Sequence, residues 1–172
     1  VADPQEYLAE DIPTLLISFA RSGNSPESVA ALDVATECLS QCYHLVLTCN
    51  ANGKLYEYCQ NNSSALALLM PEESNDRSLA MTSSFSSMMM AAVTIFLGDN
   101  VFSDSIAPFF SHYKAQFNKA NQIIRDKYAG KFKRVIYLGS GGLQGLAQEA
   151  ALKMLELTAG KVVASFDTPL GF

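Results

Sequence analysis

The sequence lacks features that mark several common classes of protein. Its 172 residues contain no lysine- or arginine-rich run interleaved with aromatic residues, and the net charge is −5. No nucleic-acid-binding surface is therefore expected in this segment. No apolar stretch reaches the roughly 18 to 20 residues that a membrane-spanning helix needs, and no basic, cleavable leader opens the chain. These absences predict a soluble, cytoplasmic protein with no membrane partner.

Cysteine is scarce and is not arranged as a disulfide framework or a metal site. The four cysteines, Cys38, Cys42, Cys49 and Cys59, form no C-x-x-C pair. His44 lies near Cys42, but one histidine and one thiol do not make a metal site. On folding, a chain of this length buries roughly 70% of the surface that it exposes when unfolded, so it needs no disulfide bonds or metal ions to stabilise its core. We therefore expect reduced thiols in the core and no metal ion.

Short apolar runs alternate with longer segments of helical period. Residues 14–20 (TLLISFA), 43–49 (YHLVLTC) and 65–70 (ALALLM) are typical of buried strands. Residues 26–40 place apolar side chains every three or four positions, which predicts a helix with one core face. This alternation indicates an α/β protein in which helices cover both faces of a parallel sheet.

The same pattern restarts in the second half of the chain. Residues 82–98 are apolar on nearly every face and predict a buried helix, and residues 105–128 predict a long amphipathic helix that ends in a solvated basic linker. A strand, a glycine-rich loop and a helix follow over 134–158, with a further strand in 161–167. We expect two domains, residues 1–98 and 99–172.

The loop after the first predicted strand reads ARSGNSPES and is rich in hydroxyl groups. Ser25 and Pro26 suit the start of a helix, so a plain capped turn explains both residues. It does not explain Ser22 or Arg21. A phosphate bound at the helix N-terminus would explain Ser22 and Ser25 as hydroxyl donors, and Gly23 would allow the backbone to approach the anion. Both interpretations stay open on these residues alone.

A second glycine-rich loop, GSGGLQG at 139–145, lacks the G-x-G-x-x-G spacing of dinucleotide-binding proteins. The helix after it carries Glu149, Lys153 and Glu156 near one face of an otherwise apolar segment. An ordinary salt bridge explains the first two of these residues. Desolvation on an apolar helix would raise the pKa of Glu156 toward a range useful for proton transfer, and Lys153 would oppose that rise while steadying an enolate oxygen.

Three motifs in order resemble one known family. SFARSGNSPES, AMTSSFSSMMMA and LGSGGLQGLAQEAALKMLELTAGKVVASFDTPLGF are similar to the sugar isomerase (SIS) family, and specifically to its AgaS group of tagatose-6-phosphate ketose/aldose isomerases and galactosamine-6-phosphate deaminases. The resemblance covers nearly the whole chain. It implies flavodoxin-like three-layer domains, two to a protein, with no cofactor. It also implies a homo-oligomer.

The resemblance also implies site residues. The family's phosphate loop maps onto Ser22, Gly23, Asn24 and Ser25. By similarity to the isomerase domain of glucosamine-6-phosphate synthase, Glu156 is the enolising base with Lys153 beside it. Ala20 stands where that relative has a serine, so one phosphate contact is missing. Four further residues are expected to line the sugar: Thr82, Ser83, Ser140 and Gly141.

The function implied is proton transfer between carbons 1 and 2 of a hexose phosphate or an amino sugar phosphate, with loss of ammonia if carbon 2 carries an amine. The alternative is a sugar-phosphate-sensing SIS module of a regulator, which needs the loop but no base. The family's T-G-A-G-T-S loop would precede Val1 and its R-H-G-P histidine would follow Phe172. We therefore expect a fragment of a double-SIS protein that is inactive alone.

Overall fold

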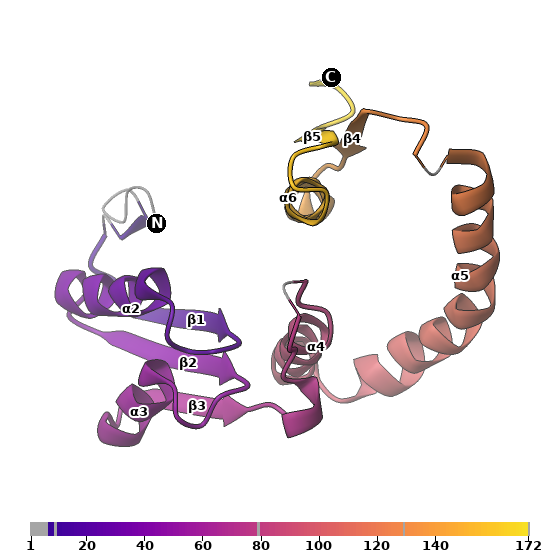
Figure 1. Cartoon of the computed structure of the whole chain (residues 1–172). Coiled ribbons are helices and arrows are strands. Elements are labelled where there is room, and N and C mark those ends of the chain that lie inside the picture. The colour runs from indigo at the N-terminus through magenta and orange to yellow at the C-terminus, as the bar shows by residue number, and fades with distance from the viewer. Residues whose placement is uncertain (1–6, 9, 79, 129, 172) are drawn as a thin grey trace. The chain divides into compact units, whose positions relative to one another are not determined.

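The computed structural model of the chain describes residues 7–8, 10–78, 80–128 and 130–171. It divides into two compact units, Val1–Phe102 and Ser103–Phe172. The first unit holds β1 (Thr14–Ala20), α2 (Pro26–Cys38), β2 (Cys42–Thr48), α3 (Lys54–Asn61), β3 (Ala65–Leu69), a 3-10 turn (Glu72–Ser74) and α4 (Ser83–Leu97). The second holds α5 (Ala107–Tyr128), β4 (Arg134–Leu138), α6 (Gly142–Leu157) and β5 (Val163–Asp167) (Figure 1). A π-helical turn (Phe102–Ile106) begins at the last residue of the first unit and leads into α5. The assignment of residues 1–98 and 99–172 to two SIS domains stays a prediction.

In the first unit, β1, β2 and β3 form a parallel sheet in that order. Thr14 lies beside Cys42, and His44 lies beside Ala65. The two crossover helices, α2 and α3, pack on one face of this sheet through Leu32 and a buried cluster that also contains Ala20, Val46, Leu55 and Cys59. Parallel strands require such crossovers. The predicted α/β class is confirmed.

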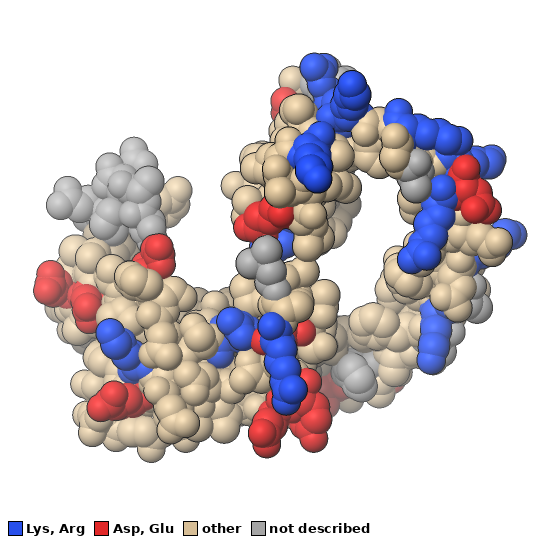
Figure 2. Space-filling model, in the orientation of Figure 1, with Lys and Arg blue, Asp and Glu red and all other residues tan. Residues whose placement is uncertain are grey.

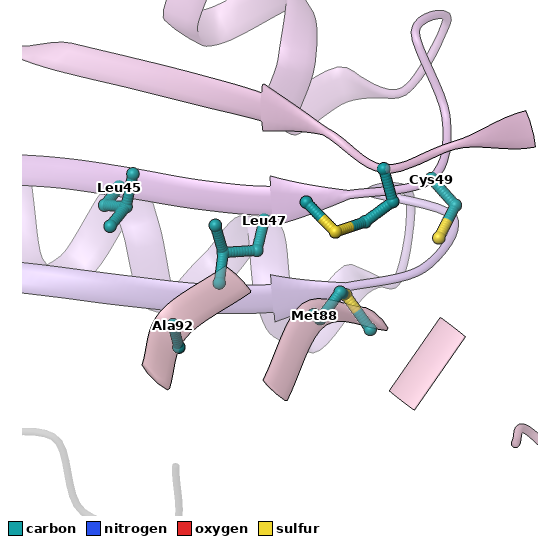
Figure 3. Close-up of a cluster of buried hydrophobic side chains, with 6 residues drawn as sticks. Leu45, Leu47, Cys49, Met88 and Ala92 are labelled. Carbon is teal, nitrogen blue, oxygen red and sulfur yellow. The ribbon is translucent and has the colours of Figure 1, made fainter. Parts of the chain in front are cut away.

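Helix α4 covers the opposite face of the sheet. Its contacts form a second buried cluster, made by Leu45, Leu47, Cys49, Met70, Met88 and Ala92 (Figure 3). Side chains of one strand alternate between the two faces, so Leu45 and Leu47 of β2 belong to this cluster while Val46 belongs to the other. Burial of these two clusters fixes the register of the strands. In this register the three strands end at a common edge of the sheet.

The prediction that α4 is buried on nearly every face is wrong. Met88 and Ala92 are buried, but Met89 is 43% exposed and Phe96 51% exposed. A hollow of about 620 Å³ lies beside the end of the helix and reaches Leu66 on β3. The helix buries a single stripe because only one side of it meets the sheet. Of its adjacent methionines, Met88 fills the core as expected.

In the second unit, β4 and β5 pair in parallel, with Arg134 beside Val163. Helix α6 buries Ala147 and Ala151. Basic side chains lie along α5 (Figure 2), and Arg125 and Lys127 near its end are exposed, as predicted for a solvated helix terminus.

The four cysteines are free. Cys49 and Cys59 are buried core thiols, as expected, whereas Cys38 is exposed at the end of α2 and does not belong to the core. Burial raises the pKa of the Cys59 thiol. Among the residues the structure describes, no helix is long and apolar enough to span a bilayer.

Candidate functional site

Three loops meet the carboxyl-terminal edge of the first unit's sheet: residues 21–25 after β1, 49–53 after β2, and 70–78 with 80–82 after β3. In open α/β sheets, ligands bind at this edge because the helix N-termini and the loop amides converge there. The predicted phosphate residues and the predicted sugar-lining residues Thr82 and Ser83 belong to these loops or to the start of the helix that follows.

Hydrogen bonds attach the 21–25 loop to the turn after β2 and to the start of α3. Nδ2 of Asn50 donates to the main-chain oxygen of Ser22 at 2.8 Å. The main-chain amide of Leu55 donates to the oxygen of Gly23 at 3.1 Å, and the amide of Lys54 donates to Oδ1 of Asn24 at 3.0 Å. These bonds fix the backbone conformation of the loop. Asn50 was not singled out from sequence, where it appears only as a turn residue.

Gly23 has a left-handed backbone, with φ of 62°. A Cβ atom here would lie 3.4 Å from Oγ1 of Thr48, 3.6 Å from Cα of Gly53 and 3.7 Å from Cβ of Leu55. The space beside Gly23 is therefore occupied by the neighbouring loop and helix. These distances are ordinary van der Waals contacts, so it is the positive φ that favours glycine here, regardless of any bound anion.

Two hydroxyl groups remain available in the loop. Ser25 is the N-cap residue of α2, but its side chain makes no capping hydrogen bond, and Pro26 follows at the start of the helix. The alternative interpretation of this loop, a plain capped turn, therefore does not explain the Ser25 hydroxyl. Oγ of Ser22 accepts from the amide of Asn24 at 3.3 Å and can still donate its own hydrogen.

The N-terminus of α4 is capped by Asp76, a residue that sequence reasoning missed. Its carboxylate accepts hydrogen bonds from the amides of Thr82, Ser83 and Ser84, at 2.9, 3.2 and 2.8 Å, and from Oγ of Ser84 at 2.7 Å. These bonds, led by the one from the Ser84 hydroxyl, hold the pKa of Asp76 well below its usual range. Of the two predicted sugar-lining residues, Thr82 also donates its hydroxyl to Asp76 at 3.3 Å. In the described part of the chain the Ser83 hydroxyl makes no such bond.

In the second unit, the loop before α6 is shaped by its glycines. Gly141 is the N-cap residue of α6 and has φ of 56°. Main-chain oxygens of Ser140 and Gly141 accept from the amides of Leu143 and Gln144, each at 3.1 Å. A Cβ atom on Gly139 would collide with the main-chain oxygen of Leu143. The loop thus turns tightly into the helix.

Lys153 forms ion pairs with both acidic residues of α6. Its Nζ lies 2.8 Å from Oε2 of Glu156 and 3.3 Å from Oε1 of Glu149. The hydrogen bond with Glu156 is the main reason that the pKa of Lys153 is raised. The side chains of Lys153 and Glu156 are 27% and 33% exposed, so the pair is partly desolvated. The predicted placement of these residues on one helix face is confirmed.

The structure brings some predicted residues together and separates others. Lys153 and Glu156 are in contact, but Ser140 and Gly141 lie at the other end of the 16-residue helix α6. At 1.5 Å per residue, Gly142 and Glu156 are about 20 Å apart along the axis. One hexose bound within this unit cannot touch both ends of α6.

The chain is similar over its whole length to known proteins. No family model matches the chain. The D-galactosamine-6-phosphate deaminase AgaS of Escherichia coli is 46% identical over 173 residues, which is 100% of this chain and 45% of that protein. AgaS of Shewanella sp. strain ANA-3 is 45% identical over 179 residues, covering 100% of this chain and 44% of the relative.

A solved structure agrees with the sequence matches. The tagatose-6-phosphate ketose/aldose isomerase from Escherichia coli superimposes with a TM-score of 0.89 at 47% identity, covering 100% of this chain and 47% of that one. The chain belongs to the AgaS group of the SIS family. It spans less than half the length of the AgaS relatives that it matches. The AgaS resemblance of its three motifs is thus confirmed over the whole chain.

Proposed function

We propose that the protein containing this AgaS chain acts on an amino sugar phosphate, converting D-galactosamine 6-phosphate to tagatose 6-phosphate and ammonia, or interconverts the corresponding aldose and ketose phosphates. The observation that carries the proposal is the 21–25 loop. Its backbone is fixed by three hydrogen bonds to the adjoining turn and helix, and Ser25 presents a hydroxyl free of capping at the start of α2. The names of the AgaS relatives support the same substrate class.

The loop suits a phosphate group for electrostatic reasons. The N-terminus of α2 carries a partial positive charge, and hydroxyl groups of Ser22 and Ser25 can donate to phosphate oxygens. Because the loop is held by Asn50 and Lys54 before any ligand arrives, little conformational entropy is lost on binding. We assign binding of the phosphate to Ser22, Gly23, Asn24 and Ser25. Gly23 contributes by allowing the left-handed turn of the backbone.

We assign the proton transfer to Glu156. After ring opening, its carboxylate removes the proton from carbon 2, giving an enolamine, and returns it to carbon 1, giving a ketimine. Water then adds to the ketimine and ammonia leaves, which yields the ketose phosphate. Lys153 donates to Oε2 of Glu156, which leaves Oε1 without a partner among the described residues and free to act as the base. Lys153 can also stabilise charge on the sugar oxygen.

One observation favours a second candidate function. Glu156 is ion-paired with a lysine that also holds Glu149, which is an ordinary arrangement on a helix surface. If that pair is structural, the 21–25 loop alone would make this chain a phosphosugar-binding module without turnover.

Incubation of the full-length protein with D-galactosamine 6-phosphate, with ammonia and ketose measured separately, distinguishes the possibilities. Equal amounts of ammonia and tagatose 6-phosphate support the deaminase. Conversion of separately supplied galactose 6-phosphate to tagatose 6-phosphate, with no ammonia released from the amino sugar, supports the isomerase. Saturable binding without either product supports the sensing module. Absence of binding would contradict the phosphate assignment.

A further inference from the structure

Arg21 connects the 21–25 loop to the segment that caps α4, where the predicted sugar-lining residues Thr82 and Ser83 lie. Its main-chain oxygen accepts from the amide of Cys49 at 3.1 Å and from Oγ1 of Thr48 at 3.3 Å, which ties it to the end of β2. Its side chain extends the other way, and Nη1 donates to the main-chain oxygen of Asp76 at 2.7 Å. A single residue next to Ser22 thus holds the segment that caps α4.

Asp76, which Arg21 holds in place, in turn fixes the start of α4. Its carboxylate binds the amides of Thr82, Ser83 and Ser84, so the whole first turn of the helix is attached to it. Hydrogen bonds to a charged acceptor are stronger than those between neutral groups. The position of the Ser83 hydroxyl relative to the 21–25 loop therefore depends on the contact between Arg21 and Asp76.

The guanidinium of Arg21 has acidic as well as basic neighbours. It lines a cavity of about 280 Å³ together with Glu72, Asn75, Asp76 and Arg77. Two of these five residues are acidic and two are basic, so their charges cancel. Its Nε is buried and has no hydrogen-bond partner within the described residues. A buried N–H without a partner is destabilising. Folding stability alone would thus not favour an arginine at this position.

We propose that Arg21 is a positioning residue that keeps Ser83 at the start of α4 in register with the 21–25 loop, so that the sugar and the phosphate of one ligand are bound together. This inference rests on the proposed function for its ligand. Arg21 contributes to recognition of the sugar part of the ligand through Asp76 and contributes little to binding of the phosphate group.

A double-mutant cycle in the full-length protein tests the proposal. Arg21→Met, Ser83→Ala and the double variant are compared by their dissociation constants for D-galactosamine 6-phosphate and for inorganic phosphate. We expect each single variant to bind the phosphosugar about five- to tenfold more weakly, with phosphate binding changed less than about twofold. The double variant should be no weaker than Arg21→Met, because Ser83 is already misplaced.

Arg21→Lys is the matched control, since a lysine can still donate to the oxygen of Asp76. We expect it to restore phosphosugar binding to within about threefold of the wild type. Equal losses for phosphate and phosphosugar in Arg21→Met would overturn the proposal and make Arg21 a direct anion ligand. Additive losses in the double variant would also overturn it, because Arg21 and Ser83 would then act independently.

Hydrogen exchange in the ligand-free protein separates this inference from the proposed function. The amides of Ser83 and Ser84 should exchange about tenfold faster in Arg21→Met, while the amides of α2 stay protected. This readout decides the inference even if the wild type binds no phosphosugar. Unchanged exchange at Ser83 and Ser84 overturns it, and a uniform increase across the unit would show a general structural role instead.

Discussion

Replacing Gly53 with alanine tests whether the 21–25 loop depends on its packing against the turn after β2. Gly53 has φ of −81° and ψ of 149°, a conformation open to any residue. The added methyl group would lie 2.6 Å from the main-chain oxygen of Ser22. Ordinary contacts of a Cβ atom begin at 3.4 Å, so the two loops would have to separate by roughly 0.8 Å.

This movement acts on the hydrogen bond that fixes the loop. Nδ2 of Asn50 donates to the same oxygen of Ser22 at 2.8 Å. Overpacking costs about 1 to 3 kcal/mol, and a weakened buried hydrogen bond adds to that cost. We expect Gly53→Ala to lower the free energy of unfolding by about 2 kcal/mol and to weaken phosphate binding at least about tenfold, since the 21–25 loop that carries the Ser22 and Ser25 hydroxyls is displaced.

Urea unfolding and calorimetric titration with inorganic phosphate and with D-galactosamine 6-phosphate measure the two effects. Gly142→Ala is the matched control, because Gly142 also begins a helical segment and a Cβ atom there meets nothing within 4 Å. The control should bind both ligands like the wild type. If Gly53→Ala also binds phosphate with wild-type affinity, the loop does not depend on this contact and the reasoning is wrong.

Two further predictions concern single side chains of the first unit. Ser22→Ala and Ser25→Ala should each weaken phosphosugar binding by about 1 to 3 kcal/mol in titration calorimetry. Ser25→Ala should change the free energy of unfolding by less than about 0.5 kcal/mol, because its hydroxyl makes no capping bond; unchanged affinity in both variants would place the phosphate elsewhere. Burial lowers the pKa of His44 below 6.5, so the unfolded chain binds the proton more tightly and the free energy of unfolding should fall as the pH drops from about 7 to 5, by at most about 1.4 kcal/mol per pH unit. The slope should flatten in His44→Gln but not in His112→Gln, where the histidine is exposed; equal slopes in both variants would contradict this.

The strands of the first unit were predictable because each is a short apolar run between turn residues. Residues 14–20 match β1, and β2 and β3 end within one residue of the predicted limits. Helix α3 was not predicted. Its eight residues carry no side-chain cap, and it is held by burial of Leu55 and Cys59 against a sheet that the local sequence does not reveal.

The candidate site was predictable only where it is local. The hydroxyl-rich loop and the ion pair of Glu149 with Lys153 follow from spacing along the chain. The reason for Gly23 does not, because it is the left-handed backbone that this residue adopts in the folded chain. The contact of Arg21 with Asp76 joins residues 55 positions apart, and nothing in the pattern of either segment indicates the other. Such contacts arise from tertiary packing, which a single sequence does not encode in any local period.

The assignment of Glu156 as the base is tested most directly by exchange of the carbon-2 proton of D-galactosamine 6-phosphate with solvent deuterium, followed by NMR in the full-length protein. Glu156→Gln should slow this exchange at least about a hundredfold. Glu149→Gln, which removes the other ion pair of the same lysine, should keep most of the rate. Exchange at the wild-type rate in Glu156→Gln would contradict the assignment.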